Sequence, residues 1–267
     1  MTLPMKKLLT ACLLLLISTG AIAQTTACLE HFVDKTAPEL TRPALQTKTV
    51  GLCFEAFAVM HSGVSRTPLW VAEKLTRESL SRARSVKRED TFHPEETLPP
   101  EDRAELADYA RSGYDRGHMA PAADMPTISA QHESFSLANI VPQQPQNNQI
   151  LWSAIEGATR HMTNQRGELY VMTGPIFEGD KVERLNRRVF VPTHIYKAVY
   201  DAEKKEGAAW ITPNTAENIY EVVSIAELEK RIRIKLFPSV PLEAKEKIAT
   251  LPEPRVRKRQ RSTREAP

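Results

Sequence analysis

The residues best suited to chemistry lie in the middle of the chain, and the first group of them surrounds His118. This histidine follows Gly117, a residue that relaxes the backbone. Asp115 and Arg116 are close enough in sequence to orient the imidazole and to tune its pKa. A neutral imidazole near physiological pH accepts a proton from a water nucleophile. A motif of this length is also compatible with a structural or surface histidine.

A second group consists of Asn148, Trp152, Glu156 and Arg160, which follow one another at intervals of four residues. On a helix each such step advances by only about 40°, so the side chains are expected to form one slowly rotating ridge. An amide oxygen, a carboxylate and a guanidinium suit a hydrated magnesium ion and a phosphate, because Mg²⁺ prefers oxygen ligands and keeps several waters. The alternative is an exposed helix on which Glu156 and Arg160 form a simple ion pair.

The elements that position these residues are predicted from hydrophobic patterning. Segments rich in Val, Tyr, Phe and Trp and bounded by Pro, Gly and Asn indicate strands at 54–61, 69–75, 169–173, 188–191, 194–200 and 208–211. Helices are expected at 148–166, at 216–221, and at 224–232 or 242–250. The Pro- and charge-rich stretch 88–108 is expected to be a long loop. Strands on both sides of one long helix, without regular β-α-β alternation, predict an α+β fold with a central, largely antiparallel sheet flanked by helices.

Residues 1–23 have the order of a secretory signal peptide: two lysines, an apolar run at 8–17 and the small-residue site Ala-Ile-Ala at 21–23. The run is shorter than the ~20 apolar residues that a spanning helix needs, which favours cleavage after Ala23 over a membrane anchor. No later segment is apolar enough to span a bilayer, so no stable membrane insertion is expected after cleavage. A short leader with lysines is typical of bacteria and predicts a periplasmic or secreted protein.

Cysteine usage is consistent with export. Cys12 leaves with the leader, and Cys28 and Cys53 remain. An even number of cysteines in an oxidising compartment predicts one disulfide. It would close a loop of about 25 residues and stabilise the fold by ~3 kcal/mol in the chain-entropy model. Lipidation of Cys28 is the alternative, which the lack of an apolar residue in Thr25-Thr26-Ala27 disfavours.

The net charge does not indicate a class of binding partner. Loss of Lys6 and Lys7 with the leader lowers the formal net charge from +3 to +1. Basic residues nevertheless gather at 82–88 and again near the C-terminus. Since no repeat or Gly/Ser linker divides the chain, residues 24–252 are expected to form one domain. Residues 253–267 are expected to form a basic, disordered tail that attracts phosphates without sequence preference.

Several ordered motifs resemble the DNA/RNA non-specific endonuclease family, which belongs to the ββα-metal, or His-Me finger, nucleases. They are Tyr114-Asp-Arg-Gly-His-Met-Ala-Pro121, Asn139-Ile-Val-Pro-Gln143 and Asn147-Asn-Gln-Ile-Leu-Trp152. The similarity extends from about Cys28 to about Ile211. It implies a ββα-metal finger in which His118, on a strand and loop, faces Asn148 on the helix.

The resemblance also implies roles for individual residues. His118 matches the general base, and Asn148 matches the sole direct protein ligand of Mg²⁺. Glu156 matches the carboxylate that orients the waters around the metal. Arg88 and Arg160 match arginines that face the phosphate. Supporting positions, without individual roles, are matched by Asp115, Arg116 and Asn139, whereas His93 stands where the family often has an arginine.

By this resemblance the chain is an enzyme that hydrolyses DNA and RNA with little sequence preference and leaves 5′-phosphate ends. Its expected cofactor is Mg²⁺, with Mn²⁺ or another divalent cation as the alternative. Two other functions stay open at this point. One is a non-catalytic nucleic-acid-binding protein of the envelope, and the other is a phosphodiesterase for another phosphodiester substrate.

Overall fold

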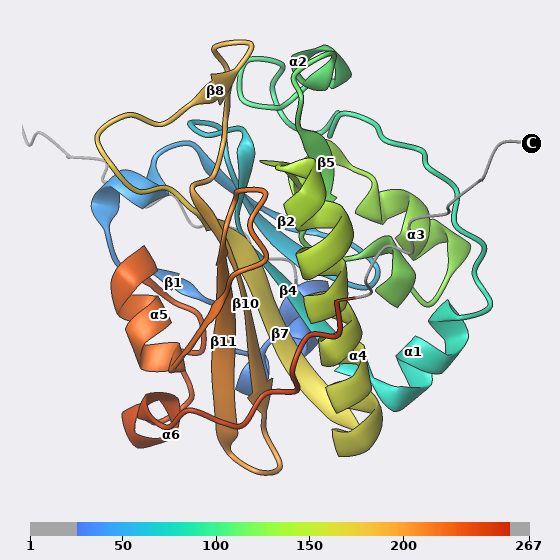
Figure 1. Ribbon diagram of the computed structural model, residues 1–267, viewed down its shortest axis with the longest axis vertical. Coiled ribbons are helices and arrows are strands. Elements are labelled where there is room, and N and C mark those ends of the chain that lie inside the picture. The colour runs from blue at the N-terminus through green and yellow to red at the C-terminus, as the bar shows by residue number, and fades with distance from the viewer. Residues whose placement is uncertain (1–25, 257–267) are drawn as a thin grey trace, which may run out of the picture.

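An antiparallel sheet runs through the middle of the computed structural model, which describes residues 26–256 (Figure 1). Its strands are β2 (Thr49–Cys53), β3 (Ala58–Ser62), β4 (Thr67–Thr76), β7 (Glu168–Ile176), β10 (His194–Asp201), β11 (Glu206–Pro213) and β12 (Glu221–Val223). They lie in the order β12-β11-β10-β7-β4-β3-β2, and each neighbouring pair is antiparallel. The predicted signal peptide at 1–23 lies outside the described residues, and so does the predicted tail at 253–267 apart from residues 253–256.

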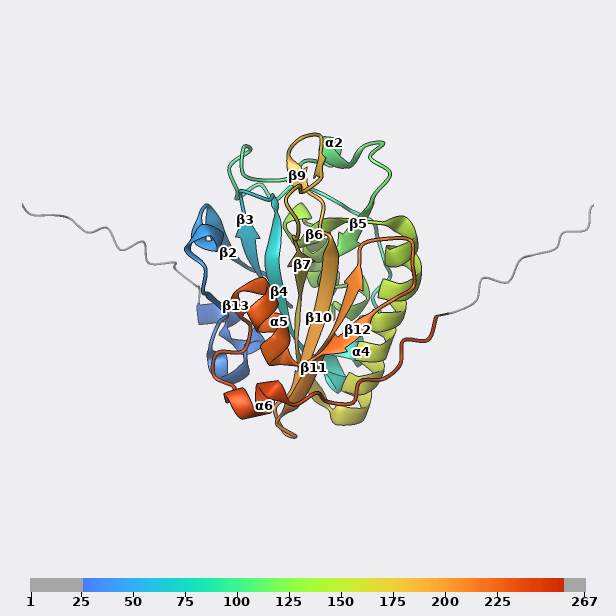
Figure 2. The ribbon, with the colours of Figure 1, turned by 60° about the vertical axis from the view of Figure 1, so that its left-hand side comes forward.

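Helices cover both faces of this sheet, as the two views together show (Figures 1 and 2). On one face lie α1 (Arg77–Ala83), α3 (Ile128–Ser134), a π-helical turn (Asn147–Trp152) and α4 (Ser153–Arg166). On the other face lie α5 (Ile225–Ile232), α6 (Leu242–Glu246) and the short 3₁₀ helices η1 (Thr26–His31) and η2 (Val33–Lys35). The predicted α+β fold with a central antiparallel sheet is therefore confirmed.

The sheet buries two separate apolar clusters because successive side chains of a strand point to opposite faces. In β4, Trp70 packs in the cluster beneath α5, and Val71 packs in the cluster beneath α4. In β10, Tyr196 packs in the cluster beneath α5, and Ile195 packs in the cluster beneath α4. Strands covered on both faces are apolar along their length, which explains why their segments could be recognised without clean alternation.

Local signals in the sequence define where the helices begin and end. Ser224 caps α5 by accepting a hydrogen bond from the backbone N–H of Glu227, whose side chain accepts from Ser224 in return. Gly167 ends α4 with a positive φ of 97°, which favours glycine. Capping chemistry therefore explains where α5 begins and where α4 ends.

Shorter elements complete the fold around the sheet. They are β1 (Glu39–Leu40), η3 (Pro43–Gln46), α2 (Leu106–Tyr109), β5 (Asp115–His118), η4 (Ala122–Asp124), η5 (Leu137–Asn139), β6 (Ile140–Gln143), β8 (Arg184–Leu185), β9 (Val189–Phe190) and β13 (Ile234–Lys235). Most of the predicted loop at 88–108 lacks helix and strand, and α2 begins near its end. The antiparallel pair β5–β6 is the part of the molecule that carries His118.

The predicted strands are mostly confirmed, with two changes of extent. The strand predicted at 54–61 begins only at Ala58, because Phe54 donates to the carbonyl of Phe57 and closes a turn. The strand predicted at 188–191 is the short β9, which pairs with β8 outside the main sheet. The helices predicted at 224–232 and 242–250 are both present, as α5 and the shorter α6.

The helix predicted at 216–221 is wrong. This segment leads into β12, which pairs with the edge of β11 and places Glu221 opposite Ile211. The Thr212 hydroxyl donates to the carbonyl of Ile219 and fixes the segment there. Backbone pairing with an open edge strand outweighs the helical tendency of a segment too short to be a stable helix alone.

The predicted disulfide between Cys28 and Cys53 is present, with Cα atoms 5.6 Å apart. It joins η1 to the end of β2, on the face of the sheet opposite α4. Among the helices of residues 26–256, none has the length and hydropathy needed to cross a membrane.

Candidate active site

His118 lies at the end of the β5–β6 ribbon, outside the main sheet. The strands pair with Gly117 opposite Val141 and His118 opposite Ile140. A Cβ atom at Gly117 would collide with the side chain of Gln143. Glycine therefore permits the close packing of the ribbon that determines where the histidine lies.

The chain that follows His118 is anchored by Asn139, which is completely buried. Its side-chain oxygen accepts from the N–H of Ala120, and its Nδ2 donates to the carbonyl of Ala120, both at 2.9 Å. Nδ2 also donates to the carbonyl of Ser134, and the backbone carbonyl of Asn139 accepts from Met119 at 3.0 Å. Since its amide is saturated inside the protein, Asn139 supports the site as an anchor of this loop.

The His118 ring is buried among aromatic side chains and is only 8% exposed. Its centroid lies 4.8 Å from that of Phe135 and 5.3 Å from that of Phe92. Its Nε2 atom is buried and has no hydrogen-bond partner among the described residues. The ring is thus held by packing in a largely dry pocket.

The pKa of His118 follows from this pocket. Burial disfavours the charged form and, with the nearby positive charge of Arg88, lowers the pKa to about 3. Asp90 acts in the opposite direction, and Arg116 adds to the lowering. The imidazole is therefore neutral at physiological pH, the state that a proton acceptor requires.

The aromatic rings that bury His118 also carry two exposed arginines. The guanidinium of Arg88 lies 5.4 Å from the centroid of Phe135, and that of Arg116 lies 4.2 Å from the centroid of Phe92. Such cation–π contacts hold a guanidinium without neutralising it. Two cations next to the histidine can therefore receive an anionic group, although Arg88 is also paired with an exposed Asp90 at 2.7 Å.

Asn148 lies in the π-helical turn that precedes α4. Its neighbour Asn147 anchors this turn, since it accepts from Gln143 at 2.7 Å and donates to Thr212 at 2.9 Å. The Asn148 Nδ2 atom donates to Asp115 of β5 at 2.9 Å, and that bond leaves the amide oxygen for another partner. Asp115 therefore links the ribbon to the helix and orients the amide, as the ββα finger implied by the resemblance requires.

Glu156 and Arg160 lie on α4 close to this site. Arg160 donates to Asp124 at 2.9 Å, whereas it lies 3.9 Å from Glu156. The ion pair with Glu156 is therefore not the main contact of Arg160. Burial raises the pKa of Glu156, and Arg160 and then Lys197 oppose that rise.

The predicted ridge of four side chains is only partly correct. Asn148 and Glu156 are half-buried, but Trp152 between them is 1% exposed and packs in the core beneath α4. The reason is the π-helical turn, which breaks regular helical spacing between Asn148 and Trp152. π-helical turns are frequent at functional sites.

The donor set fits a magnesium ion. The free amide oxygen of Asn148 and the carboxylate of Glu156 are hard oxygen donors, which Mg²⁺ prefers. No cluster of three or more His, Cys, Asp or Glu suited to a metal occurs in residues 26–256.

Sequence reasoning missed part of this site. Asp124, which is 3% exposed, binds Arg160, and the rings of Phe92 and Phe135 enclose His118. No motif marks these residues, because their roles arise from packing between distant segments. His93 stacks on His132 with centroids 4.5 Å apart. His61, Trp70 and Trp210 are buried.

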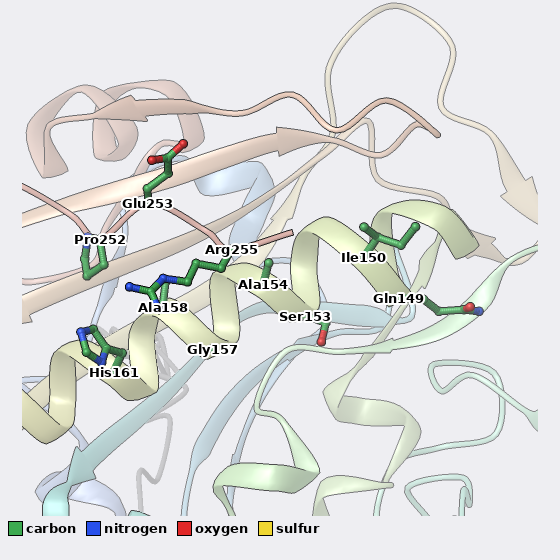
Figure 3. A pocket seen from close by; sticks show the side chains of 10 residues that line it. All are labelled: Gln149, Ile150, Ser153, Ala154, Gly157, Ala158, His161, Pro252, Glu253 and Arg255. Atoms are coloured by element: carbon green, nitrogen blue, oxygen red, sulfur yellow. The ribbon is translucent and has the colours of Figure 1, made fainter. Parts of the chain in front are cut away.

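A groove of about 970 Å³ lies on the outer face of α4 and holds none of the predicted catalytic side chains. Figure 3 shows that the segment with Glu253 and Arg255 forms its opposite wall and that Arg255 extends over the helix. Gln149 lines the groove and donates to Asp115 at 2.9 Å. The C-terminal segment therefore ends its described course beside α4, which follows the turn that carries Asn148.

Comparisons with known proteins agree with this geometry. A family model described as DNA/RNA non-specific endonuclease matches residues 37–243. The chain is 34% identical over 200 residues to Nuclease 1, mitochondrial, of Schizosaccharomyces pombe, which covers 70% of this chain and 60% of that protein. It is 30% identical over 214 residues to Nuclease EXOG, mitochondrial, of Homo sapiens, which covers 72% of this chain and 58% of that protein. The chain thus spans less than two thirds of these relatives.

A solved structure is also similar. It is described as the EndoG/EndoGI complex and the mechanism of EndoG inhibition. The match has a TM-score of 0.64 and 28% sequence identity, and it covers 73% of this chain and 88% of that chain. The similarity therefore includes most of the described fold.

Proposed function

Since the chain belongs to the DNA/RNA non-specific endonuclease family, we propose that it hydrolyses phosphodiester bonds of DNA and RNA with His118 as the general base. The observation that carries the proposal is the neutral, buried imidazole of His118 beside two exposed arginines. The imidazole accepts a proton from the attacking water, and an oxygen nucleophile forms next to the phosphorus atom.

The arginines hold the anionic substrate in this proposal. Arg88 and Arg116 flank the histidine and bind non-bridging phosphate oxygens, which places the phosphorus in line with the water. Arg160 is held by Asp124 and adds positive charge on the helix side of the site. Contacts of this kind read the backbone and leave base identity unread, which gives weak sequence preference.

The proposed cofactor is Mg²⁺, with Mn²⁺ or another divalent cation as a substitute. Asn148 would be its direct protein ligand, and Glu156 would face it through water. When bound, the ion stabilises negative charge on the phosphate and on the departing 3′ oxygen. Because water attacks and no ribose hydroxyl is needed, both sugars are substrates and the products carry 5′-phosphate ends.

Incubation of the purified protein with supercoiled plasmid, single-stranded DNA and RNA tests this function. We expect Mg²⁺-dependent degradation of all three that EDTA abolishes. His118→Ala is expected to lower kcat by ~10²–10⁴ while leaving folding and DNA binding intact. His161→Ala, on the exposed outer face of α4, is the matched control and is expected to retain full activity.

The alternatives give different results in the same assay. Salt-sensitive retention of DNA without strand breaks would indicate a binding protein. Turnover of small phosphodiesters without cleavage of nucleic acid would indicate another phosphodiesterase. Full activity in His118→Ala would exclude the proposed base.

We also propose that the protein is exported and acts in the periplasm or outside the cell. The leader at 1–23 supports this, and so does the disulfide between Cys28 and Cys53, which persists in oxidising compartments. Expression in a bacterial host followed by fractionation and mass spectrometry is expected to find a chain that begins at Gln24. An uncleaved chain in the cytoplasm would contradict export.

We further propose that the basic C-terminal residues attract substrate. Their start at Arg255, beside α4 and the turn that precedes it, supports this role. A chain that ends at Val256 is expected to show a higher KM, an unchanged kcat and a shallower dependence of DNA binding on salt. The log–log slope is expected to fall by roughly 0.9 for each phosphate that the shorter chain no longer neutralises. An unchanged salt slope would exclude a role for this segment.

A further inference from the structure

Lys197 is a fully buried lysine in the middle of the central sheet, with 1% of its surface exposed. It lies on β10, opposite Thr173 of β7 and Trp210 of β11. Its neighbours two residues away, Ile195 and Val199, pack in the cluster beneath α4, so Lys197 shares that face. A buried ammonium is unfavourable unless it is paired, and its presence here calls for a reason.

The contacts of Lys197 reach both halves of the candidate site. Its Nζ donates to Thr173 Oγ1 at 2.7 Å and to the backbone carbonyl of Met119 at 3.4 Å. Met119 directly follows His118 in the chain. Nζ also lies 5.5 Å from the centroid of a Trp152 ring, in the same π-helical turn as Asn148.

The carbonyl that Lys197 binds belongs to the segment that Asn139 also anchors. Asn139 binds the N–H of Met119 and both backbone groups of Ala120. Lys197 and Asn139 therefore bind different backbone groups of the same short segment. A shift of this segment moves the His118 ring.

Glu73 is a second buried ionisable residue on the face of the sheet beneath α4, which Val71 and Leu75 of the same strand share. It lies on β4 and is 1% exposed, and neither of its carboxyl oxygens has a hydrogen-bond partner among the described residues. Burial raises the pKa of Glu73 well above its ordinary value, and the charge of Lys197 is the largest influence opposing that rise. Lys197 also opposes the rise in the pKa of Glu156, so it is close to the helix side of the site as well.

We propose that Lys197 is a positioning residue that joins the backbone next to His118 to the turn that carries Asn148. The inference rests on the proposed nuclease function. Buried ionisable residues such as Lys197 and Glu73 are a poor means of stabilising a fold, because apolar residues of similar size often serve as well or better. Lys197 is therefore expected to serve the geometry of the site.

A double variant separates an effect on stability from an effect on the geometry of the site. The double variant Glu73→Leu/Lys197→Met fills the same space without charge and is expected to melt at or above the temperature of the unchanged protein. Its kcat, measured per folded molecule with a fluorescent oligonucleotide and Mg²⁺, is expected to fall by about 10- to 100-fold, because small misplacement of catalytic groups lowers the rate strongly. KM is expected to change by less than about threefold, because the phosphate-binding arginines are not affected.

Three further variants separate an effect on positioning from a general loss of stability. Leu228→Ala removes a buried side chain on the opposite face of the sheet and is expected to lower the melting temperature without changing kcat per folded molecule. Lys197→Gln keeps an amide donor and is expected to recover part of the kcat that Lys197→Met loses. Since Lys197 and Asn139 hold the same segment, adding Asn139→Ala to Lys197→Met is expected to lower kcat by less than the product of the separate losses.

The possible outcomes are distinct. A folded double variant with the kcat of the unchanged protein would overturn this inference and leave the nuclease function intact. Losses that multiply independently for Lys197→Met and Asn139→Ala would also overturn it. Absence of turnover in the unchanged protein would overturn the proposed function and this inference with it.

Discussion

At the scale of single residues, the dry pocket around His118 has two opposing effects. It keeps the imidazole neutral, but a group with a pKa of about 3 is a weak proton acceptor. The positive charges of Arg88 and Arg116 help to lower the pKa of His118. A phosphodiester held by these arginines offsets both charges and adds negative charge near the ring. Substrate binding is therefore expected to raise the pKa of His118 and so to create the base that the reaction needs.

The two kinetic constants kcat/KM and kcat are therefore expected to depend differently on pH. The acid limb of kcat/KM reports the free enzyme and is expected at low pH, because burial and Arg88 lower the pKa of His118. The acid limb of kcat reports the complex and is expected at higher pH. Steady-state kinetics on an oligonucleotide from pH 4 to 8 are expected to show an acid limb in kcat and none in kcat/KM, and coincident limbs would contradict the coupling.

Removal of a nearby cation tests the cause of the lowered pKa. Arg88→Met is expected to raise the pKa of His118, which NMR titration of the ring protons measures in the free protein. Arg82→Met removes an arginine with the same exposed fraction of side chain, 58%, that pairs with Glu78 on α1. This control is expected to leave the titration of His118 unchanged.

The contact with Asp124 determines whether the Arg160 guanidinium also pairs with the Glu156 carboxylate. Arg160 binds Asp124 at 2.9 Å and lies 3.9 Å from Glu156. In Asp124→Asn the guanidinium is expected to turn to Glu156, so that more Mg²⁺ is needed for half-maximal activity. Loss of the charge-assisted hydrogen bond is also expected to destabilise the fold by about 1.5–3 kcal/mol.

The matched control lies at the other end of α4, where the buried Asp201 binds Arg166 at 3.3 Å. Asp201→Asn is expected to lower stability similarly without altering the Mg²⁺ requirement. Magnesium titrations and chemical denaturation of both variants make the comparison. An equal change in Mg²⁺ requirement would show that Asp124 acts only through stability.

At the scale of elements, the site depends on how closely β5 and β6 pack. Gly117→Ala would press a Cβ atom against the Gln143 side chain and is expected to destabilise the protein by about 1–3 kcal/mol. It is also expected to lower kcat, because the ribbon that carries His118 must shift. Thermal melts and kcat per folded molecule measure the two effects.

Gly51 of β2 offers a control for this substitution, since a Cβ atom there meets nothing within 4 Å. Gly51→Ala is expected to leave both stability and kcat close to those of the unchanged protein. Loss of kcat in Gly51→Ala equal to that in Gly117→Ala would show that crowding at the ribbon is not the cause.

The same elements show what could be predicted from the sequence. Apolar runs in β4 and β10 and the long helix were recognisable, because burial on both faces and helical spacing leave local patterns. The motif residues His118 and Asn148 were recognised by resemblance. The π-helical turn was not, because it depends on the bond between Asn147 and Thr212, 65 residues away. Asp124 was missed for the same reason, since its partner Arg160 lies on another element.

At the scale of the whole molecule, the sheet separates the face that carries the candidate site from the face that carries the disulfide. The face beneath α4 carries the cluster that supports His118, Asn148 and Lys197. The other face carries the second apolar cluster, and the disulfide between Cys28 and Cys53 lies there. Changes at the disulfide are therefore expected to affect stability and to leave the chemistry unaffected.

Removal of the disulfide tests this division. Cys28→Ser/Cys53→Ser opens a loop of 25 residues and is expected to lower the free energy of unfolding by ~3 kcal/mol, or the melting temperature by roughly 6–12 °C. The unfolded chain without the crosslink is more expanded, so the slope of unfolding free energy against urea is expected to increase. At a temperature where the variant is folded, kcat is expected to equal that of the unchanged protein. A lower kcat in the folded variant, with Mg²⁺ saturating, would show that the two faces of the sheet are coupled.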